Sequence, residues 1–181
     1  GGGAARGLAH IGVIRVLEDE GFDISAITGT SMGALVGGIY AAGKLDKYTD
    51  WVTSLTKKDV IQYLDISFSA KSGILKGDLI IEALRDFVGD ISIENLPIPF
   101  LAVATDLKAR KEVWITKGDL FDAIRASIAV PGVFSPYRMA GRWMVDGGLL
   151  NRVPVTPAAQ TLSGITIAVD VTGSRSANPF G

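Results

Sequence analysis

Apolar positions in the first part of this 181-residue chain follow two spacings, one typical of helices and one of strands. Residues 8–17 carry a dense apolar pattern that stops at Gly21, which predicts a mostly buried helix. Residues 24–28 predict a short strand. Residues 32–42 are small and apolar and precede Gly43, as expected of a closely packed helix with a glycine C-cap.

Helical and strand-like patterns continue to alternate in the second part of the chain. In chain order, the pattern predicts a helix at 78–88 capped by Asp78, strands at 100–105 and 112–116, a helix at 120–129, and strands at 142–145 and 165–171. Such alternation favours an α/β layered fold with a largely parallel central sheet. With no repeat or linker visible, residues 1–181 are interpreted as a single domain.

Composition narrows the class of protein. Apolar residues make up 48% of the chain and charged residues 20%, which is typical of a globular protein. The net charge of −1 argues against nucleic acid as a partner, and the absence of cysteine excludes disulfides and thiolate metal sites. Apolar runs are too short to span a bilayer, and no signal peptide is visible. Composition leaves the localisation and the oligomeric state open.

A G-x-S-x-G pentapeptide, Gly29 to Gly33, lies between the predicted strand at 24–28 and the helix at 32–42. This placement is that of a nucleophile elbow, in which a serine occupies a strained turn that needs small neighbours. Amides at the start of the following helix can stabilise negative charge there. Ser31 is therefore the candidate nucleophile, and an ordinary N-cap serine is the alternative.

The glycine-rich start, residues 1–7, precedes the first predicted helix. One interpretation is a dinucleotide phosphate cradle, but the glycine spacing fits that motif poorly. Another is an oxyanion hole formed by the backbone N–H groups of Gly2 and Gly3. A flexible terminus is the third. Because such a turn normally follows a strand, we expect the chain to be a piece of a longer protein that lacks the first strand and a C-terminal part.

No histidine follows Ser31, so a Ser-acid-His order is ruled out. The one histidine, His10, lies upstream in the first predicted helix and is interpreted as hydrogen-bonded or solvated there. The proton acceptor is then a carboxylate or a lysine. Asp106, Asp146 and Asp170 each end or interrupt an apolar strand, and spacing alone does not choose among them. Asp146 precedes Gly147-Gly148, where another backbone or a substrate can approach closely.

Together these stretches resemble the patatin-like phospholipases, serine lipid acyl hydrolases with a Ser-Asp dyad. The resemblance is carried by five segments: GGGAARGLAHIGVIRVLE, ITGTSMGALVGGIYAAG, LAVATDL, ASIAVPGVFSP and MVDGGLLNRVPV. It implies a three-layer α/β/α fold, Ser31 as nucleophile and Asp146 as general base. It also implies an oxyanion loop with Gly2, Gly3 and Ala4, where Ala4 replaces the third glycine of the family motif.

The resemblance implies phospholipid, lysophospholipid or simple ester substrates, with no cofactor and no metal. An acyltransferase using the same dyad and a non-catalytic lipid-binding module are the alternatives. Nucleotide binding through residues 1–7 is a further alternative, but we expect that no nucleotide binds there.

Residues 44–76 are the candidate cap over the site and the candidate for peripheral membrane contact. They mix lysines with apolar side chains that suit a lipid surface, namely Trp51, Ile61, Tyr63, Leu64, Ile66 and Phe68. A peripheral helical insertion with a partly buried face is an equally good interpretation. Arg6 is a candidate for binding a lipid phosphate, but we favour a role in ordering the oxyanion loop.

Overall fold

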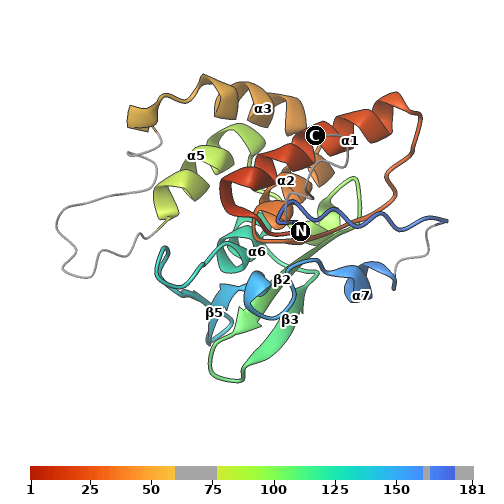
Figure 1. Ribbon diagram of the computed structural model, residues 1–181. Helices are drawn as coiled ribbons and strands as arrows, with labels where there is room; N and C mark the ends of the chain where they lie inside the picture. Colours follow the sequence, from red (N-terminus) through yellow and green to blue (C-terminus); the bar gives the residue numbers. More distant parts are fainter. Residues whose placement is uncertain (60–76, 161–163, 174–181) are drawn as a thin grey trace, which may run out of the picture.

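The computed structural model describes residues 1–59, 77–160 and 164–173, and it contains a five-stranded sheet (Figure 1). The strands are β1 (Ile27–Thr30), β2 (Phe100–Asp106), β3 (Lys111–Ile115), β4 (Tyr137–Met139) and β5 (Arg142–Asp146). The pairing order is β1-β2-β5-β4, and β3 also pairs with β2. Strand β2 is therefore the centre of the sheet, because it pairs with three of the other four strands.

The α/β class expected from the sequence is confirmed, but the sheet is mixed. Strands β1 and β2 pair in parallel, whereas the other three pairings among the described strands are antiparallel. Two of these antiparallel pairings are hairpins, β2 with β3 and β4 with β5, and a short turn can join only antiparallel strands. The expectation of a largely parallel sheet is therefore met only at the β1–β2 pair.

Helix α2 (Met32–Ala41) packs on β1 and β2, and α6 (Leu120–Ser127) packs on β2, β4 and β5. The short helix α7 (Val155–Ala158) also contacts β1. Other helices of the described ranges lie around them, namely α1 (Ala9–Asp19), α3 (Leu45–Ser54) and α5 (Asp78–Val88), with the short 3-10 turns η1 (Ala4–Leu8), η2 (Ile93–Asn95) and η3 (Gly147–Leu149). Figure 1 shows α1, α3 and α5 outside α2 and α6, on the side away from the sheet.

Helix α2 is buried along almost its whole length because its small residues allow close approach. A Cβ on Gly37 would lie 2.6 Å from the Ile27 side chain of β1, and one on Gly38 would lie 3.0 Å from Leu120 of α6. Because α2 is apolar on all sides, it forms a central helix rather than a surface helix. The start of α2, which follows Ser31, is thereby held against the sheet.

Three local predictions differ from the structure. Helix α5 begins at Asp78 as predicted, but its N-cap is Gly77, and Asp78 instead pairs with Arg125 at 3.3 Å. Helix α1 is amphipathic and buries only His10 and Ile14. Residues 165–171 form no strand in the described part of the chain. They are mostly exposed and pair with none of the described strands, so they lack the ladder hydrogen bonds that define a strand.

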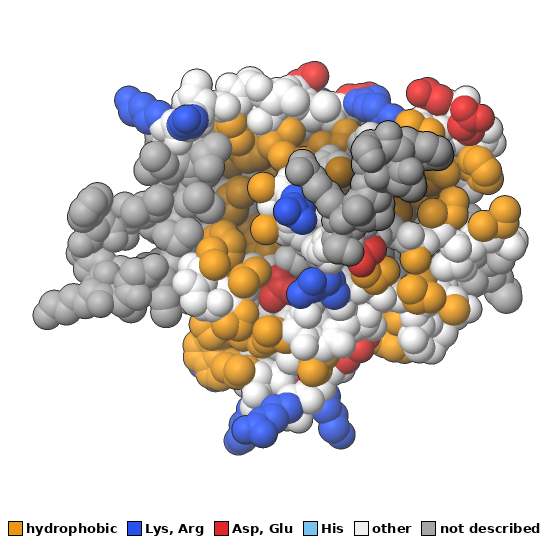
Figure 2. All heavy atoms as spheres, in the orientation of Figure 1, with side chains coloured by type: hydrophobic (Ala, Val, Ile, Leu, Met, Phe, Trp, Pro, Cys, Tyr) orange, Lys and Arg blue, Asp and Glu red, His pale blue; other side chains and the backbone are white. Residues whose placement is uncertain are grey.

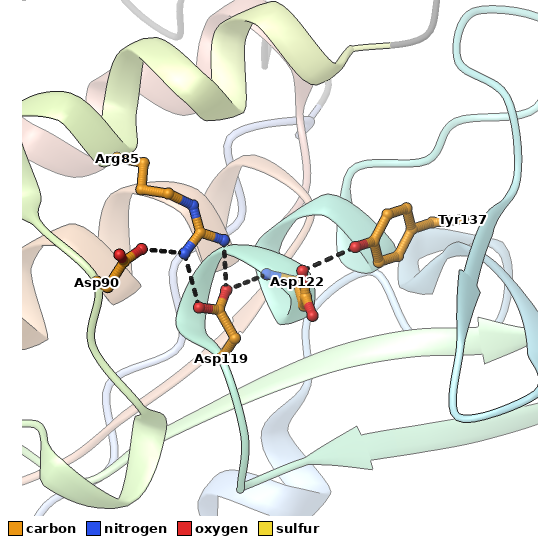
Figure 3. A network of polar contacts seen from close by, with 5 residues as sticks. All are labelled: Arg85, Asp90, Asp119, Asp122 and Tyr137. Atoms are coloured by element: carbon orange, nitrogen blue, oxygen red, sulfur yellow. Dashed lines mark hydrogen bonds and ion pairs between the residues drawn. The ribbon is translucent and has the colours of Figure 1, made fainter.

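A polar network ties α5 to the start of α6 (Figure 3). Arg85 donates two hydrogen bonds of 2.8 Å to the carboxylate of Asp119 and one of 2.5 Å to Asp90. Asp119 is the N-cap of α6 and accepts from the Asp122 amide at 2.9 Å, while Tyr137 donates to the Asp122 side chain at 2.7 Å. The network fixes where α6 begins.

None of the helices in the described ranges combines the length and the apolar character needed to cross a membrane.

Candidate active site

The strand register brings the ends of β1 and β5 together. Thr30, the last residue of β1, pairs with Val103 of β2, and Asp146, the last residue of β5, pairs with Ala104. Both strands lie on the edge of β2 opposite β3, because β3 pairs with the same β2 residues from the other side. Strand β1 is parallel to β2 and β5 antiparallel, so the two strands run toward each other. Ser31 therefore meets Asp146 at one point of the sheet.

Ser31 occupies a strained turn between β1 and α2. Its φ is 54° and its ψ −123°, a backbone conformation that costs a non-glycine residue about 1 to 3 kcal/mol. The turn leaves no room for side chains on either flank. A Cβ on Gly29 would lie 2.4 Å from the Gly33 carbonyl oxygen, and one on Gly33 would lie 2.8 Å from the Gly1 carbonyl oxygen. The predicted nucleophile-elbow geometry is present.

Asp146 is buried and keeps one carboxylate oxygen available. Its Oδ1 accepts a 2.6 Å hydrogen bond from the Gly148 amide, whereas Oδ2 has no well-formed hydrogen bond within the described ranges. Burial raises the pKa of this carboxyl, and the Ser31 hydroxyl is close enough to oppose that rise without forming a well-aligned hydrogen bond to Oδ2. Hydrogen bonds between catalytic groups are often long before a substrate binds.

The Asp146 carboxyl is a stronger base than an exposed aspartate. Burial raises its pKa above the ordinary value of 3.8, and this effect outweighs the opposite effects of Ser31, the Gly148 amide and the Arg152 charge. A raised pKa increases the ability of the carboxylate to accept a proton. Asp146 can therefore act as a general base on a neighbouring hydroxyl.

The structure separates the other two candidate aspartates from Ser31. Asp106 lies at the far end of β2 and accepts from the amides of Lys108 and Ala109 at 3.0 and 2.9 Å. It also pairs with Arg142 at 3.7 Å. Asp170 is exposed and accepts from Thr172. Each of these carboxylates caps a local turn, which leaves Asp146 as the aspartate beside Ser31.

The three predicted oxyanion residues are not equivalent. The Gly2 amide donates to the Arg152 carbonyl oxygen at 2.9 Å, so it is already occupied. The amides of Gly3 and Ala4 have no hydrogen-bond acceptor among the described residues. Ala4 has a φ of 47°, in the region that favours glycine, which agrees with its position at the third glycine of the motif. The Met32 amide, at the start of α2, is another donor near Ser31.

His10 is buried and binds the glycine-rich loop. Its Nε2 lies 2.6 Å from the Gly1 carbonyl oxygen, the same oxygen that packs on Gly33. Because a carbonyl only accepts, Nε2 carries the proton and donates. The interpretation of His10 as a hydrogen-bonded helix residue agrees with this geometry, and its position between the loop and the nucleophile turn was not foreseen.

Ser127, at the end of α6, connects the nucleophile turn to β2 by hydrogen bonds. Its Oγ accepts a 2.8 Å hydrogen bond from the Ser31 amide and donates one of 2.6 Å to the Val103 carbonyl oxygen. Ser127 is fully buried. The sequence analysis did not identify this residue, because the contact joins residues far apart in the chain. Its place near the start of the segment ASIAVPGVFSP was the available signal.

Replacing Ser127 by alanine is expected to destabilise the protein. The Ser31 amide would lose its acceptor in a buried place, which costs about 1 to 3 kcal/mol. For a chain of this size that cost lowers the melting temperature by about 2 to 12 °C, measurable by calorimetry. Ser54→Ala, which removes an exposed hydroxyl at the end of α3, is the matched control. Equal melting temperatures for the two variants would show that the Ser31 amide does not need Ser127.

A cavity of about 420 Å³ lies behind the nucleophile turn, between α1, β1 and residues 164–169. Gly1, His10 and Gly33 line it, whereas Ser31 and Asp146 do not. The cavity is therefore not the place where the two candidate catalytic side chains meet.

Part of the predicted cap is described by the structure, and that part packs on the protein. Trp51 of α3 lies 6.0 Å from the Tyr48 ring and 5.7 Å from the Phe87 ring, measured between ring centroids. Tyr48 is buried. This favours the interpretation of α3 as a helix with a partly buried face. The other five apolar residues of the predicted cap lie outside the described residues.

Comparison with known proteins identifies relatives of most of the chain. The family described as patatin-like phospholipase matches residues 1–159. An uncharacterized NTE family protein of Mycobacterium tuberculosis is 52% identical over 175 residues, which cover 97% of this chain and 48% of the relative. Neuropathy target esterase sws of Drosophila melanogaster is 31% identical over 178 residues, covering 94% of this chain and 12% of the relative.

Among solved structures, VipD from Legionella pneumophila has a similar fold, with a TM-score of 0.53 at 17% sequence identity. The likeness covers 83% of this chain and 45% of that chain. The present chain thus spans about half the length of the mycobacterial relative and a smaller part of the fly protein.

Proposed function

Since this chain belongs to the patatin-like phospholipase family, we propose that it is a serine acyl hydrolase that cleaves carboxylic esters of lipids through Ser31 and Asp146. The family match and the likeness to VipD confirm the predicted patatin-like fold. One observation carries the proposal for the dyad: the sheet register places Ser31 beside a buried aspartate whose Oδ2 is free to accept a proton.

The proposed reaction has two steps. In the first, the Ser31 hydroxyl attacks the ester carbonyl while Asp146 Oδ2 takes its proton, and the protonated Asp146 then delivers this proton to the departing alcohol. In the second, Asp146 takes a proton from a water molecule, which attacks the acyl-Ser31 ester. As the bond between Ser31 Oγ and the acyl group breaks, Asp146 returns this proton to Oγ, which releases the fatty acid and restores both side chains. The Gly148 amide holds the carboxylate in the same orientation through both steps.

Negative charge on the carbonyl oxygen needs nearby donors that are already in place. The amides of Gly3 and Ala4 are the proposed donors from the glycine-rich loop, and the Met32 amide is the proposed donor from α2. The Gly2 amide contributes indirectly, because its bond to Arg152 holds the loop beside Ser31. This modifies the prediction that Gly2 itself binds the oxyanion.

His10 is proposed to position this loop. Replacing it by leucine is expected to lower kcat about 10-fold, the loss of one good hydrogen bond, because the Gly1 carbonyl oxygen loses its donor. His10→Gln, whose amide nitrogen can also donate, is expected to recover most of the rate. The measurement is kcat on a water-soluble aryl ester. If glutamine were no better than leucine, packing rather than the hydrogen bond would be the role of His10.

The substrate class is tested by incubating the protein with a phospholipid, a lysophospholipid and a monoacylglycerol, and measuring released fatty acid by mass spectrometry. We expect release from at least one of the three, and none from Ser31→Ala. A folded protein that releases no fatty acid from any of them would contradict hydrolase activity and favour a lipid-binding module. Adding glycerol as acceptor separates the acyltransferase alternative, because acyl transfer would then yield a new acylglycerol.

Peripheral contact with a lipid surface is part of the proposal. The segment after Asp146 exposes apolar side chains beside the site, with Leu149 55% and Leu150 53% accessible. Exposed leucines next to a catalytic site suit a substrate that is drawn from a membrane or micelle surface.

A further inference from the structure

The segment that follows the Asp146-Gly147-Gly148 turn brings an arginine to the glycine-rich loop. The carbonyl oxygen of Arg152 accepts the hydrogen bond of the Gly2 amide, which fixes the arginine backbone beside that loop. A Cβ placed on Gly2 would lie 3.4 Å from Ser31 Cβ and 3.8 Å from Arg152 Cγ. The side chain of Arg152 and that of Ser31 therefore approach the same side of Gly2.

The charge of Arg152 acts at this site. Burial raises the pKa of Asp146, and the Arg152 guanidinium partly opposes that rise. Hydrogen bonds from Thr172 lower the pKa of Asp170, and the same guanidinium adds to that effect, so it lies near both carboxylates. Among the described residues, however, no carboxylate oxygen is within ion-pair distance of it, and the ion pairs involve other arginines. Its side chain is exposed and makes one long hydrogen bond, 3.4 Å, to Thr172 Oγ1.

Asp170 forms no ion pair with Arg152 among those of the described residues, although the two charges interact at longer range. Asp170 Oδ1 accepts from the Thr172 amide at 2.8 Å and from the Thr172 hydroxyl at 2.7 Å. Arg152 thus keeps most of its five N–H donors available to a ligand.

The surroundings of this charge are amphiphilic. Leu149 and Leu150 precede Arg152, Val155 follows it, and all three are exposed. Figure 2 shows one face of the molecule, on which charged and hydrophobic side chains lie close to one another. An exposed guanidinium with apolar neighbours fits a ligand that carries an anionic group next to a hydrocarbon chain.

We propose that Arg152 binds the phosphate of the lipid substrate while its ester carbonyl lies on Ser31, so that the site prefers phosphate-bearing esters over neutral ones. The inference rests on the proposed function. A guanidinium suits this role because its fork of N–H groups matches two phosphate oxygens. In this arrangement the phosphate lies at the protein surface, and the acyl chain contacts the exposed apolar side chains of Leu149, Leu150 and Val155.

The test compares two esters with the same acyl chain, a monoacylglycerol and its phosphate monoester (a lysophosphatidic acid), both below their micelle concentrations. The quantity measured is the ratio of kcat/KM for the phosphate ester to kcat/KM for the neutral ester. Arg152→Gln is expected to lower this ratio about 10- to 100-fold, the range for losing a charge-assisted hydrogen bond. Arg152→Lys, which keeps the charge without the fork, is expected to lie between.

The ratio isolates binding of the phosphate from effects on the dyad. Removing the Arg152 charge also raises the pKa of Asp146, but that change affects both esters alike and cancels in the ratio. Arg110→Gln, the same replacement at an exposed position in the turn between β2 and β3, is the matched control. It should leave the ratio unchanged.

A second measurement uses glycerol 3-phosphate as an inhibitor of neutral-ester hydrolysis. The wild-type protein should be inhibited, and Arg152→Gln should require about 10-fold more inhibitor or more. Equal inhibition by inorganic phosphate at the same concentration would instead show that Arg152 binds free phosphate and does not recognise the lipid headgroup.

An unchanged ratio in Arg152→Gln would overturn this inference and leave the hydrolase intact, as would an equal fall for both esters. A wild-type protein that cleaves neither ester and is not acylated would overturn the proposed function, and the inference with it.

Discussion

Replacing Ser31 by alanine is expected to lower kcat for ester hydrolysis by about 10⁴- to 10⁶-fold, the range found when a serine nucleophile is removed. Among the described residues, Ser31 is the one hydroxyl-bearing residue with a positive φ, 54°, so no other hydroxyl there is held in such a turn. The measurement is fatty acid release from the best substrate under conditions that saturate the wild-type protein.

The fold should survive this change. Alanine adopts the strained turn at about the same cost as serine, and the Ser31 amide keeps its hydrogen bond to Ser127. A melting temperature within a few degrees of the wild type is the control for folding. Residual activity above a few per cent in a folded Ser31→Ala protein would mean that another residue is the nucleophile.

Replacing Asp146 by asparagine is expected to lower kcat by about 10⁴-fold, as for loss of the acidic member of a catalytic triad. The amide keeps the shape of the side chain, and its oxygen can still accept from the Gly148 amide. It cannot take the Ser31 proton. Asp170→Asn is the matched control, since Asp170 is exposed and far from hydrogen-bond contact with Ser31. Equal losses in the two variants would contradict a specific role for Asp146.

The same carboxyl gives a pH dependence. Activity requires ionised Asp146, so kcat/KM should fall as the pH drops through its pKa. Because burial raises that pKa above 3.8, the fall should occur at a higher pH than for an exposed aspartate. A pH profile that stays flat down to about pH 4 would contradict Asp146 as the base.

Asp146 should also cost stability at neutral pH. A carboxyl whose pKa is raised in the folded state contributes stability below 3.8, where it is protonated in both states, and this contribution is lost as the pH rises through the raised pKa. Asparagine does not ionise. Asp146→Asn should therefore melt at a higher temperature than the wild type at pH 7, and the difference should shrink in acid.

Much of the site could be predicted from the sequence because its parts are local motifs. The Gly29-to-Gly33 turn depends on residues that are neighbours in the chain, and each glycine lies where a Cβ would collide with backbone. Helix α2 matches its predicted range to within one residue for the same reason, since its small apolar residues can only form a buried helix.

The rest depended on contacts between distant segments. Spacing along the chain left Asp106, Asp146 and Asp170 open, and only the family resemblance chose Asp146. The physical reason that Asp146 lies beside Ser31 is the register of β5 on β2, which spacing does not contain. The occupied Gly2 amide and the buried Ser127 hydroxyl also depend on such contacts. Residues 165–171 have the apolar pattern of a strand, but a strand needs a partner, and none of the described strands provides one.

The most direct test of the account is covalent labelling with a fluorophosphonate, followed by mass spectrometry of the digested protein, with Asp146→Asn treated in parallel. An adduct on the peptide that contains Ser31, formed much more slowly in the variant, is the predicted result, because the probe reacts with a serine only when a base activates it. A folded wild-type protein that acquires no adduct, or acquires one at equal rates in the two proteins, would contradict the Ser31–Asp146 dyad.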